Sequence, residues 1–194
     1  WLWRKTSPAQ PRPQNRMITF SSLDEACDAV RAFIRRCADE PRTGGFNELA
    51  LGLFAFQFAH NTPYGSLCRE EGRTPETVTD WRDIPVVPTR AFKSLDLTVL
   101  PEAERETVFR SSGTTQTNHS RHYHSRVTLA LYHASIWLWF TRHLIDDSPN
   151  RLLFLLPTLG QASESSLAHM MDAVAKHLAK RDHCFVADGQ WRIA

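Results

Sequence analysis

The sequence predicts an α/β protein in which a helical N-terminal region is followed by the start of a parallel sheet. Apolar residues recur at helical spacing between about residues 23 and 60. Two apolar runs of strand length, at 151–156 and 183–187, flank a polar loop and an amphipathic helix, which is the order of a βαβ unit. The first run, RLLFLL, does not alternate with polar residues, as is typical of strands buried on both faces of a parallel sheet.

The length of 194 residues suits one domain or slightly more. Residues 1–16 contain three prolines and show no apolar periodicity, which predicts a flexible leader. The folded portion is expected to cover residues 17–194. Met17 follows the leader directly, and a native chain that starts at this methionine is the alternative interpretation.

Helix signals organise the first third of the chain. Ser22 and Glu25 match a capping box, which predicts the start of a first helix that ends at Pro41 and the following glycines. A wide apolar stripe predicts a buried second helix over 47–60, closed by the Asn-Thr-Pro sequence at 61–63. A shorter third helix is expected over 65–71.

The middle of the chain changes character. Residues 84–88 place two prolines around a short apolar run and predict an extended segment or an edge strand. Residues 95–100 suggest another short strand, 102–107 a polar turn, and 107–109 a strand-like approach to a polar loop. A long helix is expected over 126–144. The helix is rich in aromatic residues, and three of them are interpreted as core, with an acyl-chain groove as the alternative: Trp137, Trp139 and Phe140.

Composition and charge limit the function classes. The formal net charge is +2, and the part after the leader is near neutral, so the chain offers no broad basic face for a nucleic acid. The longest apolar stretch, 127–140, is interrupted by polar residues and too short to span a bilayer. The four cysteines lie far apart, and Cys27 and Cys37 are expected to be buried reduced thiols. Together with a first segment that lacks a secretory apolar region, these features predict a cytoplasmic protein.

The residues from Ser111 to His122 carry the clearest chemical signal. Seven of these twelve positions are Ser, Thr or Gly. Hydroxyl groups and free backbone amides in a tight turn suit the binding of phosphate oxygens. The stretch has no GxxxxGK[ST] sequence, so it is not a Walker P-loop. An exposed Ser/Thr linker is the alternative interpretation of the same composition.

Here the sequence resembles a known family. The SSGTT sequence at 111–115 is similar to the phosphate-binding loop of adenylate-forming enzymes, the superfamily of acyl- and aryl-CoA synthetases. The chain resembles most the acyl-protein synthetases of bacterial luminescence operons (LuxE-type), which are related to phenylacetate-CoA ligases. The resemblance runs from about residue 44 to 180 and includes FNELAL at 46–51, FQF at 56–58, NTPY at 61–64, IP at 84–85, PTRAFK at 88–93, SRH at 120–122, LLP at 155–157 and SSL at 165–167.

The resemblance implies a two-step activation of a carboxylic, in particular fatty, acid. The carboxylate attacks the α-phosphate of ATP to give an acyl-adenylate, and the acyl group then passes to a thiol. The loop residues would hold the β- and γ-phosphates, with Mg²⁺ neutralising part of their charge. Arg121 would contact phosphate and His122 would lie near the site, while no catalytic residue is assigned. The loop residues are Ser111, Ser112, Gly113, Thr114 and Thr115. An acyl reductase and an acyltransferase are the partners that the resemblance implies.

Two departures from the family pattern support a second hypothesis. Relatives have glycine where Gln116 stands, and a lysine common near the end of the motif is missing, with Arg121 as its nearest replacement. Family members are also longer than 194 residues, so the chain is expected to be the N-terminal portion of the large domain of such an enzyme. A catalytically inactive remnant or an interaction module of the same fold is therefore the alternative function.

Other polar residues have competing interpretations. His119, His122 and His124 could place imidazoles for a metal, but polar loop histidines without a metal are expected. Lys93 is interpreted as a solvated lysine, with a charge in the substrate pocket as the alternative. Ser165 and Ser166 precede a helix, and an N-cap explains one of them, with an acyl-pocket position as the alternative. A serine hydrolase is disfavoured because the chain has no GxSxG elbow.

Overall fold

The structure is a computed structural model, and it describes residues 18–40, 44–111, 119–145, 152–178, 183–187 and 190–193. The leader predicted over residues 1–16 lies outside these ranges. The helices of the described part are α1 (Leu23–Asp39), α2 (Phe46–His60), α3 (Thr62–Glu70), α4 (Arg126–His143) and α5 (Ser166–His177). The strands are β1 (Thr107–Arg110), β2 (Arg121–His124), β3 (Leu152–Phe154), β4 (His183–Ala187) and β5 (Gln190–Ile193).

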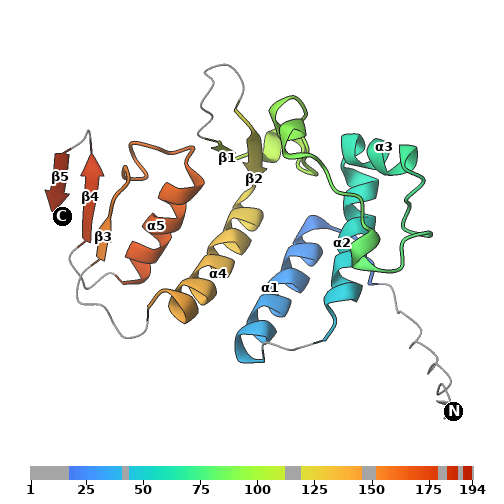
Figure 1. Ribbon diagram of the computed structural model, residues 1–194, viewed down its shortest axis with the longest axis horizontal. Helices are drawn as coiled ribbons and strands as arrows, with labels where there is room; N and C mark the ends of the chain where they lie inside the picture. The colour runs from blue at the N-terminus through green and yellow to red at the C-terminus, as the bar shows by residue number, and fades with distance from the viewer. Residues whose placement is uncertain are drawn as a thin grey trace, which may run out of the picture.

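The helices form a row, with strands at two places along it. Helices α1, α4 and α5 lie side by side, α2 and α3 lie beyond α1, and the sheet β3–β5 lies beyond α5 (Figure 1). Strands β1 and β2 sit above the start of α4 (Figure 1). In the part of the chain that the structure describes, no helix combines the length and apolar character needed to cross a lipid bilayer.

The predicted start of α1 is confirmed, but its cap differs in detail. The Ser22 hydroxyl oxygen accepts a hydrogen bond from the Glu25 backbone N–H at 3.2 Å. The Glu25 carboxylate does not return to Ser22. It accepts from the backbone N–H and the hydroxyl of Ser21, each at 2.8 Å. Ser21 offers two donors to one carboxylate oxygen, and these hydrogen bonds lower the pKa of Glu25.

Asn61 separates α2 from α3 and belongs to both. Its backbone N–H donates to the Gln57 carbonyl at the end of α2, and its side-chain oxygen accepts from the Tyr64 N–H in the first turn of α3. The predicted end of α2 is therefore confirmed. Helix α3 begins three residues earlier than predicted, because Pro63 lies in a first turn, where a missing N–H costs no helical hydrogen bond.

Residues 84–88 belong to no helix or strand and start with the extended Ile84, so the first of the two predictions there, an extended segment, is confirmed; the short strand predicted over 95–100 was wrong. The 3₁₀ turn η1 (Trp81–Asp83) precedes the segment 84–100, and the turn η3 (Glu102–Glu104), which matches the predicted turn, follows it. The turn η2 (Thr89–Lys93) lies within this segment. Its backbone groups bond locally, as in the bond from the Leu95 N–H to the Ala91 carbonyl at 2.8 Å. The apolar residues instead pack against the core between α2 and α3; they are Ile84, Val87 and Leu97.

The mixed α and β composition is confirmed, but the sheets are not purely parallel. Strands β3 and β4 pair in parallel across α5, whereas β5 pairs antiparallel with β4. Strands β1 and β2 form a separate antiparallel pair. The sequence analysis did not predict β5. Only two residues separate it from β4, and such a short connection is compatible with antiparallel but not with parallel pairing.

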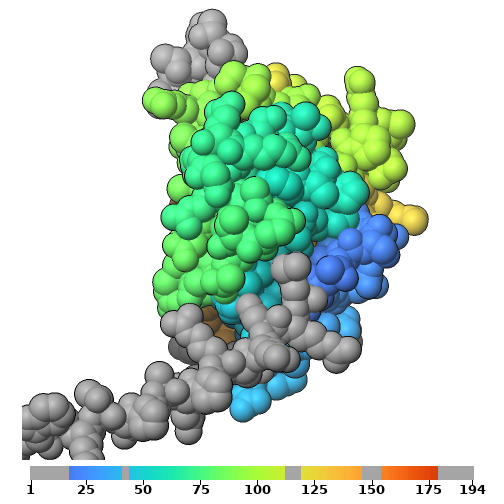
Figure 2. Space-filling model, turned by 90° about the vertical axis from the view of Figure 1, so that its right-hand side faces the viewer, coloured from blue at the N-terminus to red at the C-terminus, as the bar shows by residue number. Residues whose placement is uncertain are grey.

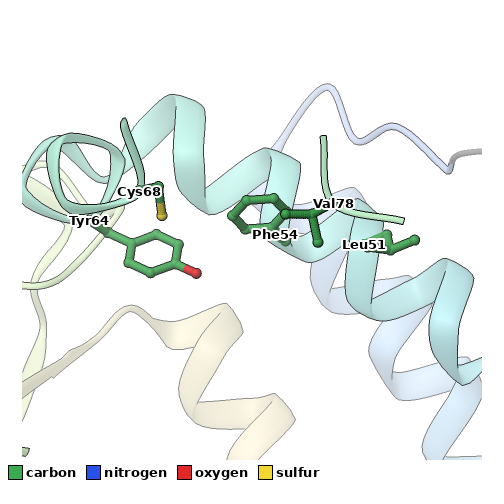
Figure 3. Close-up of a cluster of buried hydrophobic side chains, with 5 residues drawn as sticks. All are labelled: Leu51, Phe54, Tyr64, Cys68 and Val78. Atoms are coloured by element: carbon green, nitrogen blue, oxygen red, sulfur yellow. The ribbon is translucent and has the colours of Figure 1, made fainter. Parts of the chain in front are cut away.

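Two apolar clusters hold the described part together. The first joins α2 and α3 to the segment after them and consists of Leu51, Phe54, Tyr64, Cys68 and Val78 (Figure 3). These elements form one continuous face of the molecule (Figure 2). The second lies between α4, β3 and α5 and centres on Ile136, Phe154 and Val174.

The aromatic residues of α4 divide between this second cluster and the surface. Phe140 packs against the cluster, as predicted. Trp139 was wrongly predicted as core, because 65% of it is exposed and its ring stacks on His143. Trp137 stacks on His177 of α5, with ring centroids 4.3 Å apart. Helix α4 lies between α1 and α5 (Figure 1), and the exposed Trp139 shows that another part of its surface is not covered by the described residues.

Candidate functional site

Strands β1 and β2 form the frame of the candidate phosphate loop. They pair antiparallel with Arg110 opposite Arg121 and Phe109 opposite His122. The predicted strand-like approach to the loop is thereby confirmed. Ser112, Gly113, Thr114, Thr115 and Gln116 lie outside the described residues, so their predicted role stays a prediction.

Ser111 closes the neck of this loop. Its hydroxyl oxygen accepts from the Ser120 N–H at 3.0 Å, and its own N–H donates to the Ser120 carbonyl at 3.3 Å. Nδ1 of His119 donates to the Ser111 carbonyl, which assigns the proton of that nitrogen. The two ends of the candidate loop are therefore held together by side chains as well as by the strand ladder.

Arg110 ties the neck to the segment before α5. Its backbone N–H donates to the Glu164 carbonyl, and its Nε donates to the Glu164 carboxylate, both at 2.9 Å. Ser165 follows and caps α5, because its hydroxyl oxygen accepts from the Ala168 N–H at 3.2 Å. The predicted capping role of Ser165 is confirmed, while Ser166 lies exposed in the first turn.

Arg121 forms an ion pair. Its Nη2 lies 2.9 Å from Oδ1 of Asp96. The same carboxylate accepts from Nη1 of Arg105 at 3.0 Å and from the hydroxyl of Tyr123 at 3.3 Å. Burial opposes ionisation of Asp96, but Arg121 and then Arg105 and Tyr123 outweigh it and hold its pKa below the usual value. Nε of Arg121 is buried and has no hydrogen-bond partner among the described residues.

His122 lies next to Arg121 on the opposite face of the strand. Its ring stacks on Phe92 of η2, with centroids 4.7 Å apart and planes tilted by 28°. Partial burial of the ring lowers the pKa of His122, which favours the neutral imidazole. Lys93, the neighbour of Phe92, is half-buried at the end of η2.

A layer of aromatic and histidine rings lies under the strands. Phe109 is buried, and its ring centroid lies 4.5 Å from that of His124, 4.9 Å from His169 and 5.2 Å from Tyr132. Burial lowers the pKa of His124 and of His133, and each has a buried ring nitrogen without a hydrogen-bond partner in the described part. Across that part, no group of three or more His, Cys, Asp or Glu residues is arranged to hold a metal ion.

The cysteines near α1 and α3 are free thiols. Cys27 and Cys68 are buried, and burial raises the pKa of both thiols, so they are poor nucleophiles at neutral pH. Cys37 is half-buried and also free. The burial predicted for Cys27 is confirmed.

Sequence reasoning missed Asp96 and Phe92 as neighbours of the candidate site. Phe92 precedes Ser111 by 19 residues and Asp96 by 15, in a segment that was predicted to be partly extended. The one local sign in the sequence was Asp96 itself, a charged residue between Leu95 and Leu97, which suggests a side chain that pairs with another part of the protein.

One curated protein shares a partial sequence match with this chain. The chain is 38% identical over 68 residues to the long-chain-fatty-acid–luciferin-component ligase of Vibrio harveyi. The match covers 35% of this chain and 18% of that ligase. No family model and no solved structure matches the chain.

Proposed function

We propose that this chain takes part in the ATP-dependent activation of a fatty acid, as the N-terminal portion of an acyl-protein synthetase of the adenylate-forming type. The observation that carries the proposal is the 38% identity over 68 residues with a ligase of long-chain fatty acids. Because the match spans 18% of that ligase, the activity, substrates and partners are all part of the proposal. The SSGTT sequence, which lies in the chain between two paired strands, also supports it.

The proposed chemistry has two steps. A carboxylate oxygen of the acid attacks the α-phosphorus of ATP, the bond to the bridging oxygen breaks, and pyrophosphate leaves with the electron pair. A thiolate then attacks the acyl carbonyl carbon, and AMP leaves. Bound Mg²⁺ would neutralise part of the charge on the leaving pyrophosphate.

The described residues fit the binding of an anion at the neck of the loop. Arg110 and Arg121 lie opposite each other at the ends of the strands, and each is partly neutralised by one carboxylate. The Arg121 side chain is 33% exposed, so its guanidinium group can also pair with an anion at the neck of the loop. The role of these residues is to position the triphosphate and stabilise its charge.

A non-catalytic module of the same fold is the second candidate. Two features favour it: Gln116 stands where relatives have glycine, and Asp96 already engages Arg121. An acyl reductase and an acyltransferase, the partners implied by the family resemblance, could be bound by either form.

Pyrophosphate–ATP exchange with a series of fatty acids tests the proposal. We expect exchange that depends on both the acid and Mg²⁺. Thr114→Ala should lower it about 100-fold, the typical effect of removing one donor that stabilises developing charge. Thr79→Ala, at an exposed position before η1, is the matched control and should leave exchange unchanged.

Measurements of ATP binding and of pyrophosphate exchange together separate the two candidates. Arg121→Ala should weaken ATP binding, measured by isothermal titration, whereas Arg82→Ala at an exposed position should not. ATP binding without any exchange would favour the non-catalytic module. Exchange that persists undiminished in Thr114→Ala would remove the loop from the mechanism.

A further inference from the structure

An apolar cavity of about 580 Å³ lies between α1, α2 and the segment 84–97. Helix α1 contributes Val30 and Phe33, helix α2 contributes Leu49 and Leu53, and the segment contributes Val87 and Phe92. The volume falls within the range of small-molecule sites, which is about 300–1,000 Å³. The residues that line the cavity all precede the candidate loop in the sequence. The proposed function gives this cavity no role so far.

The few polar groups at this cavity already have partners. The Asn61 side-chain N–H donates to Oε1 of Gln57, and its oxygen accepts from the Tyr64 N–H. The Tyr64 hydroxyl donates to the Pro85 carbonyl at 2.9 Å, and burial raises the pKa of Tyr64, which keeps the hydroxyl protonated. A ligand here would gain apolar contacts and few hydrogen bonds, so the wall suits a hydrocarbon rather than a polar molecule.

One side of the cavity is attached to the candidate site. Phe92, which lines the cavity, stacks on His122. Four residues further on, Asp96 binds Arg121 and Tyr123 of the same strand. The apolar space thus ends beside the strand that follows the candidate phosphate loop.

A second apolar cavity, of about 510 Å³, is less suitably placed. It lies between α1 and the C-terminal end of α4 and includes Ala38, Leu138 and Trp139. Helix α4 starts directly after β2 and rises about 1.5 Å per residue, so Leu138 lies roughly 18 Å along the helix from that strand. A reactive group near the loop is closer to the first cavity.

We propose that the first cavity holds the hydrocarbon chain of the fatty acid, with its carboxylate toward Phe92 and His122. This inference rests on the proposed function. Each methylene buried there should tighten binding about fourfold, until the chain fills the space.

Three alanine-to-leucine variants of the full chain test this assignment. Ala50 lies on α2 in the wall of the first cavity, Ala38 lines the second, and Ala59 is exposed on α2. Binding of decanoate, dodecanoate, tetradecanoate and hexadecanoate, each below its micelle concentration, is measured by isothermal titration. Ala50→Leu should move the preferred chain length down by about two methylenes and weaken tetradecanoate binding about 15-fold. Ala38→Leu and Ala59→Leu should bind like the parent chain.

A second variant keeps the inference testable if Ala50→Leu does not fold. Leu53→Ala enlarges the same cavity and should move the preferred length upward. A nitroxide-labelled stearate gives the orientation: a label near the carboxyl group should broaden the His122 ring resonances more than a label near the methyl end. The reverse pattern would overturn the proposed orientation.

The outcomes separate this inference from the proposed function. Fatty-acid binding that shifts with Ala50→Leu but is not accompanied by pyrophosphate exchange supports the cavity and contradicts the ligase. Exchange whose chain-length profile is unchanged in Ala50→Leu and Leu53→Ala supports the ligase and overturns the cavity. A chain-length profile that changes in Ala38→Leu alone would place the hydrocarbon chain of the fatty acid in the second cavity. This result would likewise overturn the inference.

Discussion

Asp96 connects the segment before β1 with the strand after the candidate loop through its carboxylate. Its two carboxylate oxygens engage Arg105, Arg121 and Tyr123. Its side chain is 38% exposed, so solvent screens these contacts. Each contact is worth little alone, but they share one carboxylate and are lost together.

We predict that Asp96→Asn lowers the free energy of unfolding by about 1 kcal/mol at pH 7. The pKa of Asp96 lies below its usual value in the folded protein, so its contribution is present above pH 4 and is lost as the pH falls through the folded pKa. Urea unfolding at several pH values measures both effects. Asp83→Asn, whose partner Arg73 lies 3.9 Å away, should change stability by less than about 0.5 kcal/mol. Equal losses in the two variants would contradict the shared role of Asp96.

Contacts of this kind lie beyond sequence reasoning, whereas caps do not. The side chains of Ser22 and Ser165 bond to an N–H three residues ahead, so a local pattern suffices to predict them. The carboxylate of Asp96 accepts a hydrogen bond from Tyr123, which lies 27 residues later in the sequence. Only the folded chain brings these two residues together.

At the scale of elements, the helices were predicted to within a few residues, apart from the start of α3. Helical periodicity and cap residues are local signals, and α1 and α5 carry both. Helix α4 has the cap of Ser125 but no one-sided apolar pattern, and α2 starts at Gly45 without a side-chain cap. The strand expected over residues 95–100 failed, and residues 84–88 are extended without forming a strand, because a strand requires a neighbour to pair with. The apolar residues there are explained equally well by packing against α2 and α3.

The cap of α5 is the element-scale feature to test. Ser165→Ala should destabilise the protein by about 1 kcal/mol, because the Ala168 N–H loses its acceptor. Ser166→Ala is the matched control, since the Ser166 side chain is exposed and provides no cap hydrogen bond. Thermal unfolding followed by circular dichroism compares the two. A cost at Ser166 equal to that at Ser165 would contradict the assigned cap.

At the scale of the whole molecule, the two apolar clusters are joined by α1 and α4. Nη1 of Arg142 on α4 donates to the Cys37 and Ala38 carbonyls at the end of α1, at 3.4 and 2.9 Å. The sequence does not predict this junction or the cavity beside α1, because both depend on how the helices pack. Strand β5 was not predicted either, because it is a run of only four residues in which polar side chains alternate with apolar ones; once the strand is known, its short connection to β4 requires the antiparallel pairing.

The histidine layer predicts a pH dependence of the whole fold. Burial lowers the pKa of His124 and His133 below the ordinary value of 6.5, and nearby positive groups, among them His169 for both, lower it further. The unfolded chain therefore takes up protons that the folded state resists, and stability falls as the pH drops from about 7 to 5. The melting temperature should decrease by several degrees over this range.

A pair of substitutions isolates this effect. His124→Phe keeps a ring beside Phe109 and should reduce the decline of the melting temperature. His143→Phe, at an exposed position of α4, should leave the decline as in the parent chain. A decline of equal size in both variants would show that His124 does not contribute.

The stack of Phe92 on His122 and the ion pair of Asp96 with Arg121 join the wall of the apolar cavity to the strand beyond the candidate loop. A molecule that shifts this wall must also displace the strand, and one that draws the strand toward the loop must move the wall. Ligand binding in the apolar cavity and ligand binding at the candidate loop are therefore coupled. The coupling is reciprocal: the factor by which the first ligand changes the affinity of the second equals the factor by which the second changes the affinity of the first.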